Sequence, residues 1–125
     1  TNLRVVFADL EGCDLEDERS NYNAYNVNYI SPTRLNDGKR TKEDDVFSLG
    51  VCFSYIQWDP EMDIYYPYKE MQRAKSTDLW TYYQFMIDYI HKTHWQSCIL
   101  KMMAEKRQDR PIAEVLLKDL KAIIL

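Results

Sequence analysis

Apolar and polar positions change their spacing along this chain, and each spacing predicts a different element. The continuous apolar run from Leu3 to Ala8, rich in Val and Phe, is typical of a buried strand, which we place within residues 1–9. No helical or strand period continues into residues 10–40, where acidic side chains are followed by repeated Asn. Because Asn favours turns over regular elements, we predict one long irregular loop over residues 10–40.

A different pattern follows, in which residues 46–56 are apolar almost all round. Thr41, with Asp44 three residues later, fits a capping box at the start of a helix. A helix without a polar face belongs at the centre of a domain, so we predict a central buried helix over residues 41–57. A strand is the alternative for a run so rich in β-branched and aromatic side chains.

Helical periodicity continues in the last part of the chain. Apolar residues spaced three and four positions apart predict helices over about 76–90 and 95–104, and Pro111 suits the first turn of a further helix. These elements make a helical subdomain over residues 76–125. We therefore predict a single, mainly α domain with one or two short strands at its N-terminus.

Composition and charge narrow the function classes. The chain has 125 residues, of which 46% are hydrophobic and 29% charged, an ordinary globular mix. Its net charge of −4 does not favour a nucleic-acid partner, and without 18 consecutive apolar residues we expect no membrane span. Three widely spaced cysteines without a CxxC pair favour reduced thiols in a cytoplasmic or nuclear protein. The chain begins with Thr1 and not Met, which suggests that it was excised from a longer protein.

Three blocks of sequence stand out in order along the chain. The first is VVFADLE at 5–11, the second joins YISPTRL at 29–35 to DVFSLGV at 45–51, and the third joins RQDRP at 107–111 to EVL at 114–116. Together they resemble the second half of a eukaryotic protein kinase domain. The blocks are similar, in turn, to the strand entering the Asp-Phe-Gly motif, to the Ala-Pro-Glu stretch with the opening of the central helix, and to the closing Arg-Pro motif.

The resemblance implies a kinase C-lobe-like fold in which residues 10–40 correspond to the activation segment. It also implies that Asp9 matches the carboxylate that binds Mg²⁺. The sequence lacks a Gly-rich loop, its Lys and a His-Arg-Asp stretch, and one carboxylate cannot hold Mg²⁺ against water. We therefore expect this chain alone to need no cofactor and to catalyse nothing, whereas ATP and Mg²⁺ would belong to an active kinase of which it is part.

Three further positions have structural roles by resemblance. Thr33 stands where the family has a Glu that pairs with an Arg matching Arg110, so that ion pair cannot form here. Because a buried charge without a partner is costly, Arg110 must find Asp109, Asp37, Asp44 or solvent. Asp45 is retained, and in the family it accepts backbone hydrogen bonds from the catalytic loop, which this sequence lacks.

Other candidate residues come from composition alone. The aromatic residues around one proline are equally consistent with core packing and with an interaction patch, because aromatic side chains with polar tips are enriched in interfaces; they are Tyr65, Tyr66 and Tyr68. Hydroxyl side chains that could be phosphorylated are Ser20, Tyr22 and Thr41.

Two functions compete at this stage. The first is a pseudokinase-like module that acts by protein–protein interaction, with a partner protein or an upstream segment of the same parent covering the central helix. The second is a C-terminal fragment of an active, ATP-dependent protein kinase that phosphorylates Ser, Thr or Tyr of proteins. A helical domain whose kinase-like blocks are coincidental is a third, blander interpretation.

Overall fold

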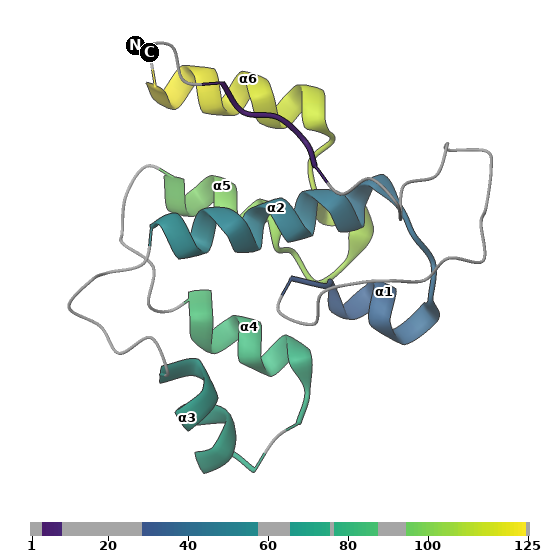
Figure 1. Cartoon of the computed structure of the whole chain (residues 1–125), viewed down its shortest axis with the longest axis vertical. Coiled ribbons are helices and arrows are strands. Elements are labelled where there is room, and N and C mark those ends of the chain that lie inside the picture. Colours follow the sequence, from purple (N-terminus) through teal and green to yellow (C-terminus); the bar gives the residue numbers. More distant parts are fainter. Residues whose placement is uncertain (1–3, 9–28, 58–65, 76, 88–94, 125) are drawn as a thin grey trace.

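The structure is a computed structural model that describes residues 4–8, 29–57, 66–75, 77–87 and 95–124. Within these ranges the chain is mainly α-helical (Figure 1). The elements, in chain order, are α1 (Pro32–Asp37), α2 (Lys42–Ile56), α3 (Tyr66–Arg73), α4 (Leu79–Ile87), α5 (Trp95–Met102), the 3₁₀ turn η2 (Arg107–Asp109) and α6 (Ala113–Ile124).

Helix α2 begins where the capping pattern predicts. The Thr41 side chain accepts a hydrogen bond from the backbone N–H of Asp44, at 3.3 Å, and the first turn carries three acidic residues. Both features stabilise a helix N-terminus, because they satisfy a free N–H and complement the helix dipole. The helix predicted over residues 41–57 is therefore confirmed, and the strand alternative for this run is wrong.

The main core lies between α2, α4 and α5. Phe47 and Val51 of α2 are fully buried against Tyr83 and Met86 of α4 and Ile99 of α5. The rings of Phe47 and Tyr83 meet edge to face with centroids 5.0 Å apart, an arrangement that aromatic pairs prefer. This packing holds α2 on the other two helices.

A close approach of α2 and α5 depends on Gly50. A Cβ at this position would lie 2.8 Å from Cγ of Met103 and 3.0 Å from Cβ of Met102. Any larger residue would push the two helices apart, so Gly50 sets their spacing. A second, smaller core joins α2 and α5 to α6 through Val46, Met102 and Leu116 together with Cys98.

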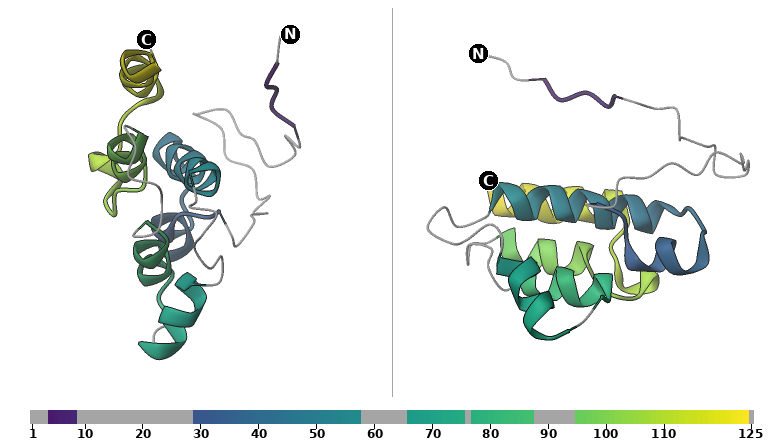
Figure 2. Two further views of the ribbon diagram at one scale, coloured as in Figure 1. Left: turned by 90° about the vertical axis from the view of Figure 1, so that its left-hand side faces the viewer. Right: turned by 60° about the horizontal axis from the view of Figure 1, so that its bottom comes forward.

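Several sequence predictions are corrected. Residues 4–8 form no strand, and Val5 and Phe7 are 97% and 93% exposed; in both views of Figure 2 the segment runs apart from the helices. A strand needs a neighbour for its backbone groups, and the described residues supply none. The irregular loop predicted over residues 10–40 contains α1, which begins with Ser31 as its cap. Predictions for residues 9–28 lie outside the described part.

Helix boundaries in the last part also differ from the sequence prediction. The helix predicted over about 76–90 is described as α4, Leu79–Ile87, and α3 was not predicted at all. The helices predicted near residue 95 and after Pro111 are present as α5 and α6. Within the described ranges, no helix combines the length and the apolar character needed to cross a membrane.

Candidate functional site

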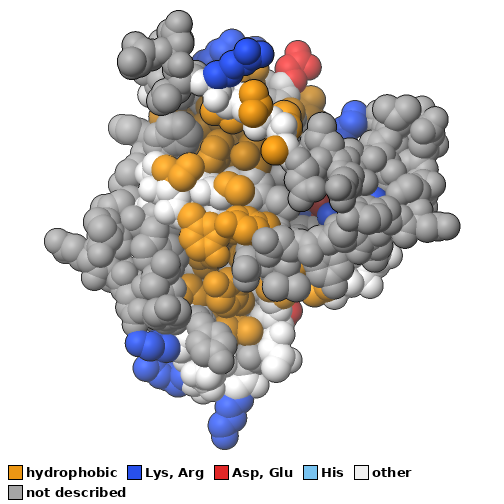
Figure 3. Space-filling view, viewed as in Figure 1, with side chains coloured by type: hydrophobic (Ala, Val, Ile, Leu, Met, Phe, Trp, Pro, Cys, Tyr) orange, Lys and Arg blue, Asp and Glu red, His pale blue; other side chains and the backbone are white. Residues whose placement is uncertain are grey.

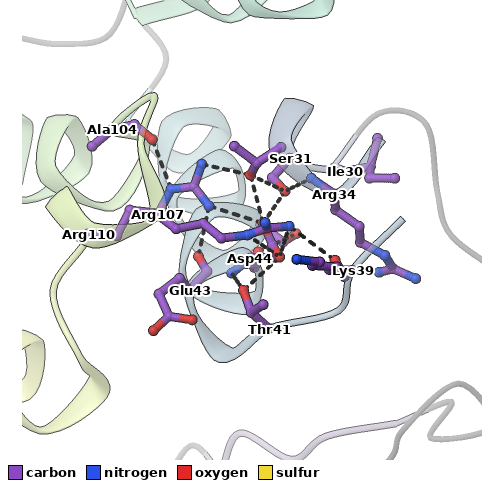
Figure 4. Close-up of polar contacts among 12 residues, drawn as sticks. Ile30, Ser31, Arg34, Lys39, Thr41, Glu43, Asp44, Ala104, Arg107 and Arg110 are labelled. Atoms are coloured by element: carbon purple, nitrogen blue, oxygen red, sulfur yellow. Dashed lines mark hydrogen bonds and ion pairs between the residues drawn. The ribbon is translucent and has the colours of Figure 1, made fainter. Parts of the chain in front are cut away.

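The carboxylate of Asp44, in the first turn of α2, lies at the centre of a dense group of polar contacts (Figure 4). Asp44 is only 4% exposed. Its Oδ1 accepts hydrogen bonds from the hydroxyls of Ser31 and Thr33, and its Oδ2 accepts one from the hydroxyl of Thr41, at 2.7 Å. These three hydroxyls come from the segment before α1, from α1 itself and from the cap of α2, so one carboxylate ties the three together.

Two guanidinium groups complete the site from the other end of the chain. Nη1 of Arg110 donates to Oδ1 of Asp44 at 3.1 Å, and Nε of Arg107 donates to Oδ2 at 3.1 Å. Arg107 also forms an ion pair with Asp37 at the end of α1. We call this group the Asp44 cluster; its members are Ser31, Thr33, Thr41, Asp44, Arg107 and Arg110.

Arg110 has partners for every nitrogen of its guanidinium group. Nε donates to the carbonyl of Ala104 at 2.8 Å, and Nη2 donates to the hydroxyl of Thr33 at 3.1 Å and to the carbonyl of Glu105 at 3.2 Å. The guanidinium carbon also lies 4.9 Å from the ring centroid of Phe47, within cation–π range. A fully buried charge is tolerated here because it is paired and its donors are satisfied.

The structure identifies the acid that pairs with Arg110. Of the acceptors considered for Arg110, the structure uses Asp44, which comes from α2. The Thr33 hydroxyl accepts a hydrogen bond from Arg110 and donates one to Asp44 at 2.9 Å. The side chain at position 33 therefore contacts both members of this ion pair.

Electrostatics within the cluster favour charged carboxylates. Burial pushes the pKa of Asp44 upward, but hydrogen bonds from Ser31, Thr41, Arg107 and Thr33 outweigh it and leave the pKa below its ordinary value. The hydrogen bond from Arg107 lowers the pKa of Asp37 to about 2. Arg107 in turn has a raised pKa, chiefly because it donates to Asp37. The cluster is therefore fully charged at neutral pH.

The neighbouring Asp45 behaves in the opposite way. It is exposed, and within the described residues its carboxylate has no hydrogen-bond or ion-pair partner. Desolvation raises the pKa of Asp45, the positive charge of Arg34 opposes that rise in part, and the negative charge of Asp44 adds to it. The charge of Arg34 therefore does not fully offset the cost of charging Asp45.

Asp45 begins a line of outward-facing residues on α2, which we call the outward row: Asp45, Leu49, Cys52 and Ile56. They are four, three and four positions apart, a spacing that places them on one face of a helix. Leu49 is 42% and Ile56 is 73% exposed, and Cys52 is exposed as well. Figure 3 shows hydrophobic side chains gathered in a band that crosses α2 on the face seen in Figure 1. Helix α2 was predicted to be buried on all sides. This prediction is wrong for the outward row, which is exposed to solvent.

A shallow apolar groove lies elsewhere on the described surface. It has a volume of about 290 Å³ and brings together residues from the segment before α1, from α1, α3 and α4: Ile30, Leu35, Met71, Thr77, Leu79 and Tyr82. None of these described lining residues carries a charge that would fix a ligand in one orientation.

Several predicted site residues cannot be placed. Asp9, Ser20, Tyr22 and Tyr65 lie outside the described residues. The backbones of Tyr66 and Tyr68 belong to α3, whereas their side chains lie outside what the structure describes. Within the described ranges, no group of three or more His, Cys, Asp or Glu side chains could hold a metal ion.

The sequence pattern did not single out two of the six members of the Asp44 cluster. Ser31 and Arg107 were not singled out, although Ser31 before a proline is a readable cap signal. Asp44 was recognised as part of a capping box, and its partner Arg110 lies 66 positions away. A contact over that distance leaves no trace in local spacing.

Comparisons with known proteins add no assignment. A scan of protein-family models, a search of curated proteins and a search of solved structures each found no match to this chain.

Proposed function

We propose that this chain is a pseudokinase-like C-lobe module that acts by binding another polypeptide and does not catalyse phosphoryl transfer by itself. The observation that carries the proposal is the outward row of α2. A central helix with three apolar side chains open to solvent is unusual for a protein that works alone, because large apolar patches on monomers commonly mark interaction sites.

The Asp44 cluster supports the kinase-like part of the proposal. Arg110 comes from the third block of the resemblance, Thr33 comes from the second, and Asp44 directly precedes the second stretch of that block. Two blocks that are far apart in the sequence therefore meet in space through the arginine that the resemblance singles out. A chance similarity of short motifs gives no reason for such a contact.

The exposed Asp45 supports the binding part. By resemblance, this carboxylate accepts hydrogen bonds from a catalytic loop, and the sequence contains no such loop. In the described residues Asp45 is unpartnered and its pKa is raised by desolvation. Such a group is stabilised when an incoming segment brings donors or a positive charge.

Light scattering over a dilution series tests the open row. With no partner present, we expect the wild-type chain to associate weakly and without fixed stoichiometry as its concentration rises, and the variant Leu49→Glu/Ile56→Lys to stay at the 15.0 kDa of the monomer. Leu117→Lys, at an exposed apolar residue of α6, is the matched control and should leave the wild-type behaviour unchanged. A wild-type chain that remains a monomer at every concentration and also binds no amphipathic peptide would contradict the proposal.

A thermal-shift assay with ATP and Mg²⁺ separates the module from an active kinase. The proposal predicts no change in Tm, because the chain lacks the residues that would hold the phosphates. A rise in Tm that depends on both ATP and Mg²⁺, and that Asp9→Asn removes, would favour the fragment of an active kinase.

A further inference from the structure

The outward row combines an acid with an apolar stripe. Asp45 lies one turn before Leu49, and the four residues extend over about 16 Å at the helical rise of 1.5 Å per residue. The stripe offers apolar contact along its length and negative charge at one end. A partner that fits must therefore carry both an apolar row and a positive charge at the matching end.

The backbone of α2 decides which secondary structure the partner needs. Its N–H and C=O groups are used within the helix, so α2 offers side-chain contacts only. An extended segment laid on this surface would leave its own backbone groups without partners. A helix satisfies its own backbone and packs on another helix through side-chain ridges, with axes 8–10 Å apart.

The charges on α2 argue against a second copy of the same chain. If two α2 helices packed antiparallel, Asp45 of one would meet the last turn of the other, which contains no basic residue. If they packed parallel, Asp45 would face Asp45. Neither arrangement places a cation directly opposite Asp45, because Lys42 lies about one turn before it along the helix, so the charge pattern favours a different protein.

We propose that the outward row binds an amphipathic helix of a partner protein that places a Lys or Arg against Asp45. This rests on the proposed function, because it names the kind of partner for the same surface. The cation pairs with the carboxylate of Asp45, which has no hydrogen-bond or ion-pair partner among the described residues, and apolar residues of the partner at three- and four-residue spacing cover Leu49, Cys52 and Ile56.

Two synthetic peptides test the charge requirement by fluorescence anisotropy. Both are amphipathic helices of about 18 residues, long enough to hold helical structure, with Leu at matching positions. One carries Arg at the position that faces Asp45 and the other carries Glu. We expect wild-type protein to bind the Arg peptide roughly three- to tenfold more tightly than the Glu peptide at low salt.

Variants of the protein complete the test. Asp45→Lys should reverse the preference, so that the Glu peptide binds more tightly, and Asp45→Asn should remove it. Glu114→Lys, which makes the same charge change on the exposed start of α6, should leave the preference unchanged. Asp45 is exposed, so these variants should keep the far-ultraviolet circular dichroism of the wild type.

The outcomes separate this inference from the proposed function. Suppose that Ile56→Lys abolishes binding of both peptides while Asp45→Lys leaves the preference unchanged. The outward row is then still the binding surface, and the inference that the partner needs a cation is overturned. If neither peptide binds, both proposals are overturned. A stoichiometric wild-type dimer that Ile56→Lys dissociates and Asp45→Lys does not affect would assign the row to a second copy and overturn the inference.

Discussion

The two sides of α2 have nearly the same apolar composition and opposite environments. On the inner side Phe47, Val51 and Ser54 are fully buried, whereas on the outer side Leu49 and Ile56 are exposed. Hydrophobicity alone does not separate these faces. What separates them is the fit of the inner side: Gly50 admits α5 at close range, and the Ser54 hydroxyl donates to the carbonyl of Gly50 at 2.9 Å.

The adjacent acids Asp44 and Asp45 repeat this contrast at the start of the helix. Asp44 is buried, accepts hydrogen bonds from five residues and has a lowered pKa, whereas Asp45 is exposed, unpartnered in the described residues and has a raised pKa. The comparison teaches that partners, and not the residue type or its position in the helix, decide what a carboxylate contributes. The side of α2 whose polar groups have partners within the chain stabilises the fold, and the other side is available for binding.

The largest difference should appear when the two acids are changed in the same way. Asp44→Asn removes the charge that faces buried Arg110, and breaking a buried pair costs about 3–5 kcal/mol. Asp45→Asn removes a carboxylate without a partner, so the free energy of unfolding should stay within about 0.5 kcal/mol. Urea unfolding followed by circular dichroism measures both values. Equal losses in the two variants would contradict the contrast between the faces.

A smaller difference is expected between two small residues on opposite sides of α2. Gly50→Ala places a Cβ against Met102 and Met103, and overpacking of this kind costs about 1–3 kcal/mol, partly offset by the better helix propensity of Ala. Cys52→Ala, on the exposed side, should change the free energy of unfolding by less than about 0.5 kcal/mol. The same urea titration compares them, and a neutral Gly50→Ala would mean that the two helices separate easily.

Lowering the pH should destabilise the fold through Asp37 and Asp44 and stabilise it through Asp45. The pKa values of Asp37 and Asp44 are lowered, so their contribution is complete above the ordinary value of 3.8 and is lost at lower pH, for Asp37 as the pH falls toward about 2. Asp45 has a raised pKa, so its protonation adds stability as the pH falls. Asp37 is 39% exposed, so solvent screening limits its share to about 1 kcal/mol or less. Unfolding midpoints measured across this range for Asp37→Asn should fall less steeply than those of the wild type.

The smallest expected effect is a surface change on the outer side. Ile56→Lys should alter the free energy of unfolding by no more than about 0.5 kcal/mol, because Ile56 is 73% exposed. Val51→Lys, on the same helix and fully buried, is the matched opposite and should prevent stable folding. A large loss of stability in Ile56→Lys would show that the outer side is already covered within the chain.

How far the sequence predicted the fold depends on how local each signal was. The capping residues of α2 and the apolar spacing in α5 and α6 are local, and these helices were predicted. Helix α3 was missed because Pro67 was taken as part of a loop, although proline is accepted in the first turn of a helix. The strand predicted within residues 1–9 is absent from the described residues 4–8, because an apolar run becomes a strand only where another strand pairs with it.

The candidate site could be predicted only in part for the same reason. The resemblance alone implied a Glu where Thr33 stands, and from it we predicted that Arg110 needs another acid, with Asp44 among the acceptors considered. Local spacing could not choose among them, because the choice depends on how α1 and η2 approach α2. The exposure of Ile56 and Leu49 was equally hidden, since it depends on which side of α2 the other helices occupy.

The position of Arg110 has a consequence for how the described helices unfold. Its guanidinium group contacts the ring of Phe47 on one side and the carboxylate of Asp44 on the other. The main hydrophobic core and the Asp44 cluster therefore share the side chain of Arg110. We expect the two to open together. We expect backbone amides in α1 and in the middle of α2 to exchange with deuterium at similar rates, as members of one cooperative unit.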